Sequence, residues 1–446
     1  MATAVRQRKA PTKEKEHDVL ASSDSEEEQD ATKALEDSFP PFVVPQLTIK
    51  EVLGAIPAHC FERSALRSST YVVADFAMIT ALVYAASYID PAFNFQNGEI
   101  LSGWAGFAAK WSLWSVYWIL QGWVGTGVWI LGHECGHQAF STSKTINNTM
   151  GLFLHSFVLV PYHSWRISHA KHHAATGHMT RDEVFVPRTA SFRKVAPTGK
   201  KLKVSKGVEL DELLEDAPLY RLTWVLVQQL FGWPAYLFSN ASGQLWYPAW
   251  TNHFDPKSLI FDARHRGQVL LSDAFLVGMF GLLAVFGHYW GGLSAVVKYY
   301  VIPYLFVNHW LVMITYLQHT DPQLPHYNAP QWNFQRGALC TMDRNMLGPV
   351  GPYLMHGICE THVAHHVSSK IPHYHAWEAT EALKNFLGEH YHSTDENMFV
   401  SLWKCYKQCR YVDDEGDVLF YRDAYGRARR VAQLPDVPSD SGVDVE

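Results

Sequence analysis

Long segments without charged residues constrain the fold of this chain more than any other feature. The segment Trp111–Leu131 carries no charge over 21 residues, and about 20 apolar residues in a helix suffice to cross the hydrocarbon core of a bilayer. Backbone groups inside a bilayer must be hydrogen-bonded within the segment, so such segments cross as helices. Hydrophobic residues make up 48% of the chain and charged residues only 18%. The sequence therefore predicts an all-α integral membrane protein.

Four segments are predicted to be transmembrane helices arranged in two hairpins: Tyr71–Ile89, Trp111–Leu131, Ala274–Trp290 and Tyr299–Gln318. The second hairpin is expected to turn at Gly291 and Gly292. The segment Leu222–Ser239 is also long enough to cross, but it contains Gln228, Gln229 and Pro234, and we interpret it as an interfacial helix. The run Met150–Val160 would reach only about 16 Å as a helix, so it too is interpreted as interfacial.

The two ends of the chain are polar and flank one membrane domain. Residues 1–44 include an acidic run and no signal-peptide core, which predicts a disordered acidic cytosolic N-terminal tail. Residues 426–446 are expected to be a disordered acidic C-terminal tail, which leaves 45–425 as the membrane domain. Seven basic residues between Arg188 and Lys206 indicate a cytosolic loop by the positive-inside rule. Thr48 and Glu51 form a capping-box pattern, which predicts a short amphipathic helix on the membrane surface.

Three short histidine clusters carry the chemistry of the chain. They read H-E-C-G-H, H-A-K-H-H and H-V-A-H-H, and their histidines are His133, His137, His169, His172, His173, His362, His365 and His366. Residues three and four apart share one helix face, so each cluster can direct its imidazoles at a common point. Eight imidazoles exceed the needs of one tetrahedral metal, and they predict two metal ions held close together. Imidazole binds zinc, iron, copper and nickel, so the ligand type leaves the metal open.

The predicted spans decide whether these clusters can meet. Four spans place all three clusters and both termini on the cytosolic side, whereas a crossing by Leu222–Ser239 would separate the third cluster from the others. His319 closes the fourth span at the same surface, and this position predicts a ninth ligand. His288 falls on the opposite side. The remaining histidines lack cluster spacing and are interpreted as structural or solvated: His155, His163, His178, His326, His356, His373 and His375.

The first cluster also matches H-E-x-x-H, the signature of zinc metalloproteases, in which Glu134 would be the general base. This alternative explains one cluster and leaves six of the eight histidines without a role. We therefore expect Glu134 to orient a histidine ligand or to lie on the surface. The six cysteines form no C-x-x-C pair, which indicates neither a zinc ribbon nor a disulfide framework. A nucleic-acid partner is not expected, because no basic patch is interleaved with aromatic residues.

The order of the three clusters and the two hairpins resembles the membrane fatty acid desaturase family and, within it, the fungal oleate delta-12 desaturases. The stretch from Ile56 to Ser64 (I-P-A-H-C-F-E-R-S) and the run Y-L-Q-H-T around His319 are also similar to that group. The resemblance implies a nonheme di-iron centre held by His133, His137, His169, His172, His173, His319, His362, His365 and His366. Related acyl-CoA desaturases have an asparagine four residues before the ninth histidine, where this chain has Thr315.

The resemblance also implies an oxygen-dependent reaction that removes two hydrogens from adjacent methylenes of an acyl-lipid chain and leaves a cis double bond. Oleoyl chains would become linoleoyl chains. Since no H-P-G-G haem motif is present, electrons are expected from a separate cytochrome b5 and its NADH-dependent reductase. The family implies residence in the endoplasmic reticulum membrane.

Several alternatives remain open from the sequence. A delta-15 (omega-3) desaturase, a bifunctional delta-12/delta-15 enzyme and a related fatty acid hydroxylase would use the same histidines. A metal transporter is disfavoured, because the predicted spans contain few polar residues. The sequence does not decide between phospholipid and CoA as the acyl carrier, nor does it give the oligomeric state or the residues that bind the acyl chain.

Overall fold

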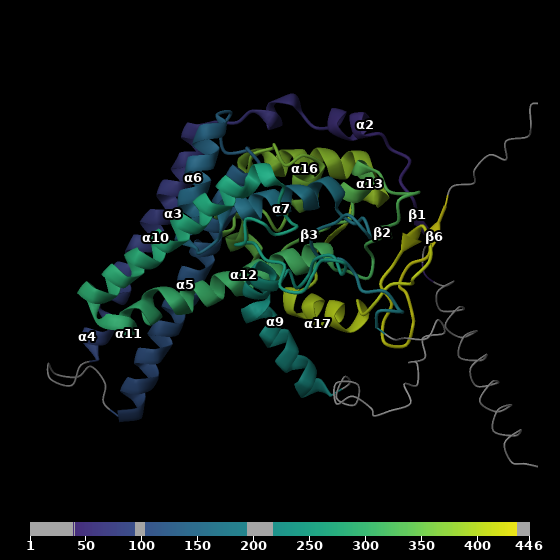
Figure 1. Ribbon diagram of the computed structural model, residues 1–446. Coiled ribbons are helices and arrows are strands. Elements are labelled where there is room, and N and C mark those ends of the chain that lie inside the picture. Colours follow the sequence, from purple (N-terminus) through teal and green to yellow (C-terminus); the bar gives the residue numbers. More distant parts are fainter. Residues whose placement is uncertain (1–38, 40, 94–102, 194–216, 435–446) are drawn as a thin grey trace, which may run out of the picture.

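The computed structural model describes residues 39, 41–93, 103–193 and 217–434. Two helical hairpins converge at one end on a cap of shorter helices (Figure 1). The first hairpin consists of α3 (Ala65–Ala86), the short α4 (Ile89–Ala92) and α5 (Gly103–Gly136). Ser64 caps α3 by accepting a hydrogen bond from the Arg67 backbone N–H. Helix α5 packs against α3, α6 (Lys144–Phe157) and α12 (Ile302–His319), which makes it the central helix.

The second hairpin begins with the 3₁₀ turn η2 (Ala263–His265) and α10 (Arg266–Trp290). It returns through α11 (Gly292–Val296), the π-helical turn η3 (Val297–Val301) and α12. The predicted turn is confirmed, because Gly291 and Gly292 adopt φ of 118° and 71°, a region that glycine enters at little cost. The two hairpins are joined at this end by Asp90, which pairs with Lys298 and, at 2.9 Å, with Lys110.

Three helical segments in the described part of the chain are long and apolar enough to cross a membrane: Ala65–Ala92, Ala263–Trp290 and Gly292–His319. Most of α10 is not covered by protein, and its exposed side chains include Phe275, Val277 and Phe280. An exposed apolar face of this kind is typical of contact with lipid. Helix α5 contains the second predicted span, Trp111–Leu131, but it is richer in glycine, tryptophan and tyrosine, and its C-terminal half is buried inside the protein.

Two helices that were predicted as interfacial lie beside the hairpins. Helix α6 contains most of the run Met150–Val160, and α9 (Pro218–Ser239) contains the segment Leu222–Ser239. Helix α7 (Tyr162–Ala175) lies between them in sequence and carries the second histidine cluster. Helix α9 packs mainly against α12, and its C-terminal half is the more buried half.

The cap consists of the N-terminal segment and residues after α12. Its helical elements are α2 (Ile49–Gly54), η1 (Ala58–Phe61), α13 (Phe334–Ala338), η4 (Gly348–Val350), α14 (Gly351–Leu354), α15 (His362–Val367), α16 (His373–Leu387), η5 (Gly388–His390) and α17 (Met398–Gln408). Three two-stranded sheets tie it together: parallel β1 (Phe42–Val43) with β6 (Ala432–Gln433), antiparallel β2 (His326–Tyr327) with β5 (Val418–Leu419), and parallel β3 (Asp343–Arg344) with β4 (Ser393–Thr394).

Strands β1 and β6 lie just outside the predicted domain boundaries at 45 and 425. They pair with each other, and Phe42 of β1 packs against Phe420. This pairing joins the two ends of the chain, so no local sequence pattern reveals it. The rest of both predicted tails, 1–38 and 435–446, lies outside the described residues, as do residues 194–206 of the basic loop.

The predicted capping box of α2 is confirmed, since Thr48 and Glu51 exchange both hydrogen bonds. The expected position of α2 on the membrane surface was wrong. Val52 is fully buried in a cluster with Ala379 and Leu383 of α16, so the apolar face of α2 packs on the cap. An amphipathic helix has the same pattern whether its apolar face meets lipid or protein.

Candidate metal centre and its cavity

The nine predicted ligands come from four helices whose ends meet under the cap. His133 is in the last turn of α5, and His137 follows directly after that helix. Helix α7 supplies three histidines, α15 supplies three, and His319 is the last residue of α12. The structure brings all nine together in two adjacent groups.

The larger group contains five histidines: His133, His137, His169, His173 and His365. Each offers one ring nitrogen, and these nitrogens all lie within 4.8 Å of one another. Two pairs are closer, since the Nε2 atoms of His133 and His137 and those of His169 and His173 are each 3.2 Å apart. We call this set the five-histidine group.

The smaller group contains His172, His319 and His366, whose nitrogens also lie within 4.8 Å of one another. His362 joins it, because its Nε2 is 3.1 Å from the Nε2 of His319. We call these residues the four-histidine group. The two groups touch where the rings of His173 and His366 stack, with centroids 4.1 Å apart.

The helical spacing of the second cluster explains how one helix serves both groups. Adjacent residues of an α-helix are rotated by about 100°, so His172 and His173 diverge; His173 lies with His169 in the five-histidine group, and His172 lies in the four-histidine group. The third cluster divides in the same way, with His365 in one group and His366 in the other. The number of imidazoles predicted two groups of ligands, but the expectation that each cluster aims at one common point was wrong for the second and third clusters, which divide between the two groups.

The surroundings of the ring nitrogens are suited to metal coordination. Among the described residues, several buried imidazole nitrogens have no hydrogen-bond partner, including His133 Nδ1, His365 Nε2 and His366 Nε2. Orphaned polar atoms of this kind are costly in a protein interior. Burial, followed by repulsion between neighbouring imidazoles, holds the pKa of His169, His173 and His366 well below the usual value. These rings are therefore neutral, as metal ligands must be.

One carboxylate contacts a predicted ligand, and a second holds the start of the helix that carries the third cluster. Asp182 Oδ1 is 2.6 Å from His172 Nδ1, and Asp182 Oδ2 accepts a hydrogen bond from the Gly177 backbone N–H. The contact fixes the tautomer that leaves His172 Nε2 free for a metal. Asp343 accepts a hydrogen bond from the Val363 backbone N–H at the start of α15. Neither carboxylate was predicted from the sequence, because neither lies at a fixed spacing from the histidine or helix that it supports.

Replacing Asp182 with asparagine should lower metal content or activity by about 10- to 100-fold, as is typical when a carboxylate behind a histidine ligand is lost. The amide keeps the shape but removes the negative charge next to His172. The measurement is bound metal and product formed per mole of purified protein. The exposed Asp255, replaced in the same way, is the control. Equal metal content and activity in the Asp182→Asn protein and the control would contradict the assignment.

Glu134 has a structural contact that the protease alternative does not predict. Its Oε2 accepts a hydrogen bond from the His373 backbone N–H at 3.0 Å, at the start of α16. Burial raises its pKa to about 8. Its Oε1 is 3.7 Å from His133 Nδ1, beyond hydrogen-bond distance, so an orienting role for Glu134 stays a prediction. The hypothesis of a metalloprotease general base finds no support in this position.

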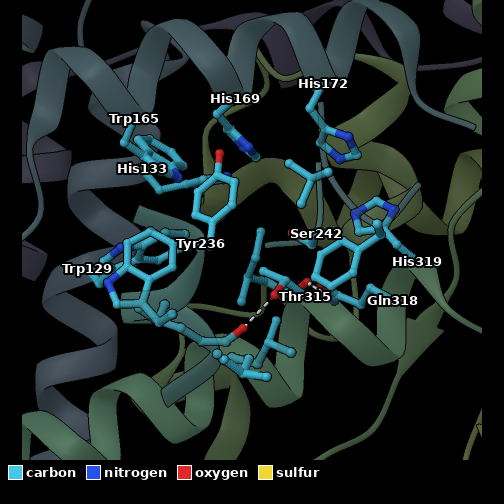
Figure 2. A pocket seen from close by; sticks show the side chains of 18 of the residues that line it. Trp129, His133, Trp165, His169, His172, Tyr236, Ser242, Thr315, Gln318 and His319 are labelled. Atoms are coloured by element: carbon cyan, nitrogen blue, oxygen red, sulfur yellow. Dashed lines mark hydrogen bonds between the residues drawn. The ribbon is translucent and has the colours of Figure 1, made fainter. Parts of the chain in front are cut away.

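A cavity of about 260 Å³ opens directly on the histidines (Figure 2). Both groups contribute to its wall, through His133 and His169 from one and His172, His319 and His362 from the other. Most of the remaining wall is apolar and comes from α5, α7, α9 and α12: Trp129, Ile130, Trp165, Trp233, Leu311, Val312 and Ile314. The cavity thus joins a polar metal-binding end to an apolar interior.

The cavity wall includes residues of α9 and also Thr315, positions that the sequence alone did not reveal. Helix α9, predicted only as an interfacial helix, supplies Trp233 and Tyr236 to the cavity. Tyr236 lies near Ser168, with 3.0 Å between the two hydroxyl oxygens. Thr315 also lines the cavity, and its hydroxyl donates to the Leu311 carbonyl at 2.7 Å. The residue at the asparagine position of related enzymes therefore faces the same space as His319.

The histidines that were interpreted as structural have protein contacts. His155 is fully buried, and its Nε2 is 3.1 Å from the Trp129 carbonyl oxygen. His356 Nε2 is 2.9 Å from Asp75 Oδ2 of α3. His375 differs, because it lies in a third group of potential ligands on the surface.

Comparison with known proteins agrees with this site. The model of the fatty acid desaturase family matches residues 111–397. A "Delta(12) fatty acid desaturase" from Mortierella isabellina is 50% identical over 382 residues, which covers 85% of this chain and 92% of the relative. An "Oleate hydroxylase" from Claviceps purpurea is 40% identical over 431 residues, covering 91% and 87%. A "Delta(12)-fatty-acid desaturase" from Arabidopsis thaliana is 41% identical over 407 residues, covering 89% and 95%. This chain belongs to the fatty acid desaturase family.

Proposed function

We propose that this enzyme is a delta-12 acyl-lipid desaturase that converts oleoyl chains into linoleoyl chains. One observation carries the proposal: an apolar cavity has five imidazoles of the two histidine groups in its wall. An acyl chain can fill the apolar part while one pair of its carbons faces the histidines. The relatives named delta-12 desaturases, at 41 to 50% identity, support the choice of the delta-12 position.

The two histidine groups are proposed to hold two iron ions, with the five-histidine group and the four-histidine group each holding one. Bound iron supplies, with oxygen, the oxidising power that unactivated C–H bonds require and that no side chain offers. The protein residues have other tasks. The apolar wall excludes water and holds the acyl chain in position, and Asp182 fixes the orientation of His172.

The membrane arrangement is proposed to be four spans, with both termini and the nine proposed ligand histidines on the cytosolic side of the endoplasmic reticulum. Convergence of the first and third clusters supports an even number of crossings between them, so α9 is proposed not to cross. The proposed membrane domain contains the predicted residues 45–425 and extends at both ends to include the paired strands β1 and β6. Cytochrome b5 and its reductase are the proposed source of electrons.

A second candidate is a fatty acid hydroxylase, because the oleate hydroxylase from Claviceps purpurea is 40% identical over 91% of this chain. A hydroxylase and a desaturase can share the same metal ligands and apolar cavity, so these features do not separate them. The shape of the cavity near His319 and Thr315 is the place where the two reactions are expected to differ. A delta-15 or bifunctional enzyme differs instead in which carbons reach the histidines.

Expression in yeast tests the proposal, since yeast makes oleate but little polyunsaturated lipid. We expect linoleate to appear in the fatty acid profile and to be absent with His365→Ala. Added linolenate would identify a bifunctional enzyme, and a hydroxylated fatty acid would identify the hydroxylase. Membrane-localised protein that makes no new fatty acid would overturn the delta-12 proposal; feeding linoleate would then reveal a delta-15 enzyme.

A further inference from the structure

A third group of potential metal ligands lies on the surface, outside the nine-histidine centre. It consists of His59, His375 and Glu378, each of which offers one ligand atom, and the three atoms lie within 4.8 Å of one another. His59 and Glu378 are about half exposed, so an ion in solvent can reach them. These three residues belong neither to the histidine clusters nor to the residues of the proposed reaction.

The fold holds the three side chains together through a packed contact between distant segments. His375 and Glu378 are three residues apart on α16 and therefore share a helix face. His59 comes from η1, which packs on α16. Cys60 of η1 and Ala379 of α16 are both fully buried in the same apolar cluster. Figure 1 shows the N-terminal segment that carries α2 lying along α16.

The presence of a third donor beside the His59–Glu378 pair points to a common cation. His59 Nε2 is 2.8 Å from Glu378 Oε2, and an exposed pair of this kind contributes little to stability by itself. An ion pair needs only two partners, yet the ring of His375 lies across the ring of His59, with centroids 5.8 Å apart and planes at 79°. A third donor atom directed at the same point is what a metal requires.

We propose that His59, His375 and Glu378 form a surface site for a divalent cation of the zinc class, which fastens η1 to α16. Two imidazoles and a carboxylate are the ligand set of open zinc sites, in which water takes the fourth position. The hard cations magnesium and calcium prefer oxygen ligands throughout. The proposal is independent of the desaturase assignment.

The neighbouring Cys60 is not among the proposed ligands. Its Sγ lies 4.0 Å from His59 Nε2, but the residue is fully buried in the apolar cluster between η1 and α16. The proposed ligands are therefore the three side chains that face the surface, and water is expected in the fourth position.

The experiment is a cobalt titration of the purified, iron-containing, full-length protein, because Co²⁺ replaces zinc and absorbs visible light. We compare the unaltered protein with Glu378→Gln and His59→Gln. The control is Glu381→Gln, which removes an exposed carboxylate of the same helix that pairs with Lys384 instead. The nine-histidine centre can also bind cobalt. The measurement is therefore the difference in bound Co²⁺ per chain between proteins that all contain this centre.

We expect the unaltered protein and the Glu381→Gln control to bind one more Co²⁺ per chain than Glu378→Gln and His59→Gln. Loss of one ligand should weaken binding at least about tenfold, since even loss of an outer partner has that effect. Zinc should compete, and magnesium should not. Cobalt should also raise the unfolding temperature of the unaltered protein more than that of either variant. Equal uptake by the unaltered protein and both variants, each with an unchanged unfolding temperature before cobalt is added, would overturn the proposal.

Discussion

Replacing His319 with alanine should abolish formation of the new double bond and remove one of the two proposed iron ions. His319 is buried, and its Nε2 is 3.1 Å from that of His362. Without it the four-histidine group keeps only His172, His362 and His366. The five-histidine group is unchanged, so the remaining iron should stay bound. The measurement combines fatty acid profiles of yeast with iron counted per mole of purified protein.

A second variant, in the five-histidine group, tests the same centre from its other side. His365→Ala leaves four histidines in the five-histidine group, so iron should be lost less completely while activity is still abolished. His288→Ala is the control, because His288 is exposed near the far end of α10. Under the metalloprotease alternative, alanine at His173, His319 or His365 would be harmless. Full activity in the His319→Ala protein would therefore contradict the two-group centre.

Replacing Arg344 with methionine should destabilise the protein by about 3–5 kcal/mol, because it leaves a buried carboxylate without its partner. The Arg344 side chain is only 2% exposed, and its Nη2 is 2.6 Å from Asp321 Oδ2. Its Nε also donates to the Leu317 carbonyl at 2.7 Å, and its backbone N–H donates to the Cys359 carbonyl. Arg344 thus ties the end of α12, which carries His319, to the segment that leads into the third cluster.

The unfolding temperature of the detergent-solubilised protein measures this effect. The double variant Arg344→Met/Asp321→Asn should unfold at a higher temperature than Arg344→Met, since removal of both charges leaves no unpaired ion in the interior. The Arg344→Met protein should also contain less iron per mole than the unaltered protein. An Arg344→Met protein that unfolds at the normal temperature would show that this ion pair does not hold the metal-bearing segments together.

Much of the metal centre was predictable because its information is local. Spacing of three and four residues fixes which histidines share a helix face, and the number of imidazoles indicated two metal ions. His319 was predicted from its place at the end of an apolar segment. Asp182 was not, because it is brought to His172 by the chain that follows α7. Arg344 was also missed, since a single arginine in a polar stretch resembles a surface residue.

The sequence by itself determined the membrane-type helices, the turn at Gly291 and Gly292, and the nine histidines. Each depends on residues within a few positions of one another, where helical geometry and glycine backbone freedom decide the outcome. Only the tertiary structure decided that α9 lines the cavity, that α2 packs on α16, and that β1 pairs with β6. It alone brought His59 to His375 and Glu378. These contacts join segments that are distant in the sequence, and an apolar helix face does not encode whether lipid or protein will cover it.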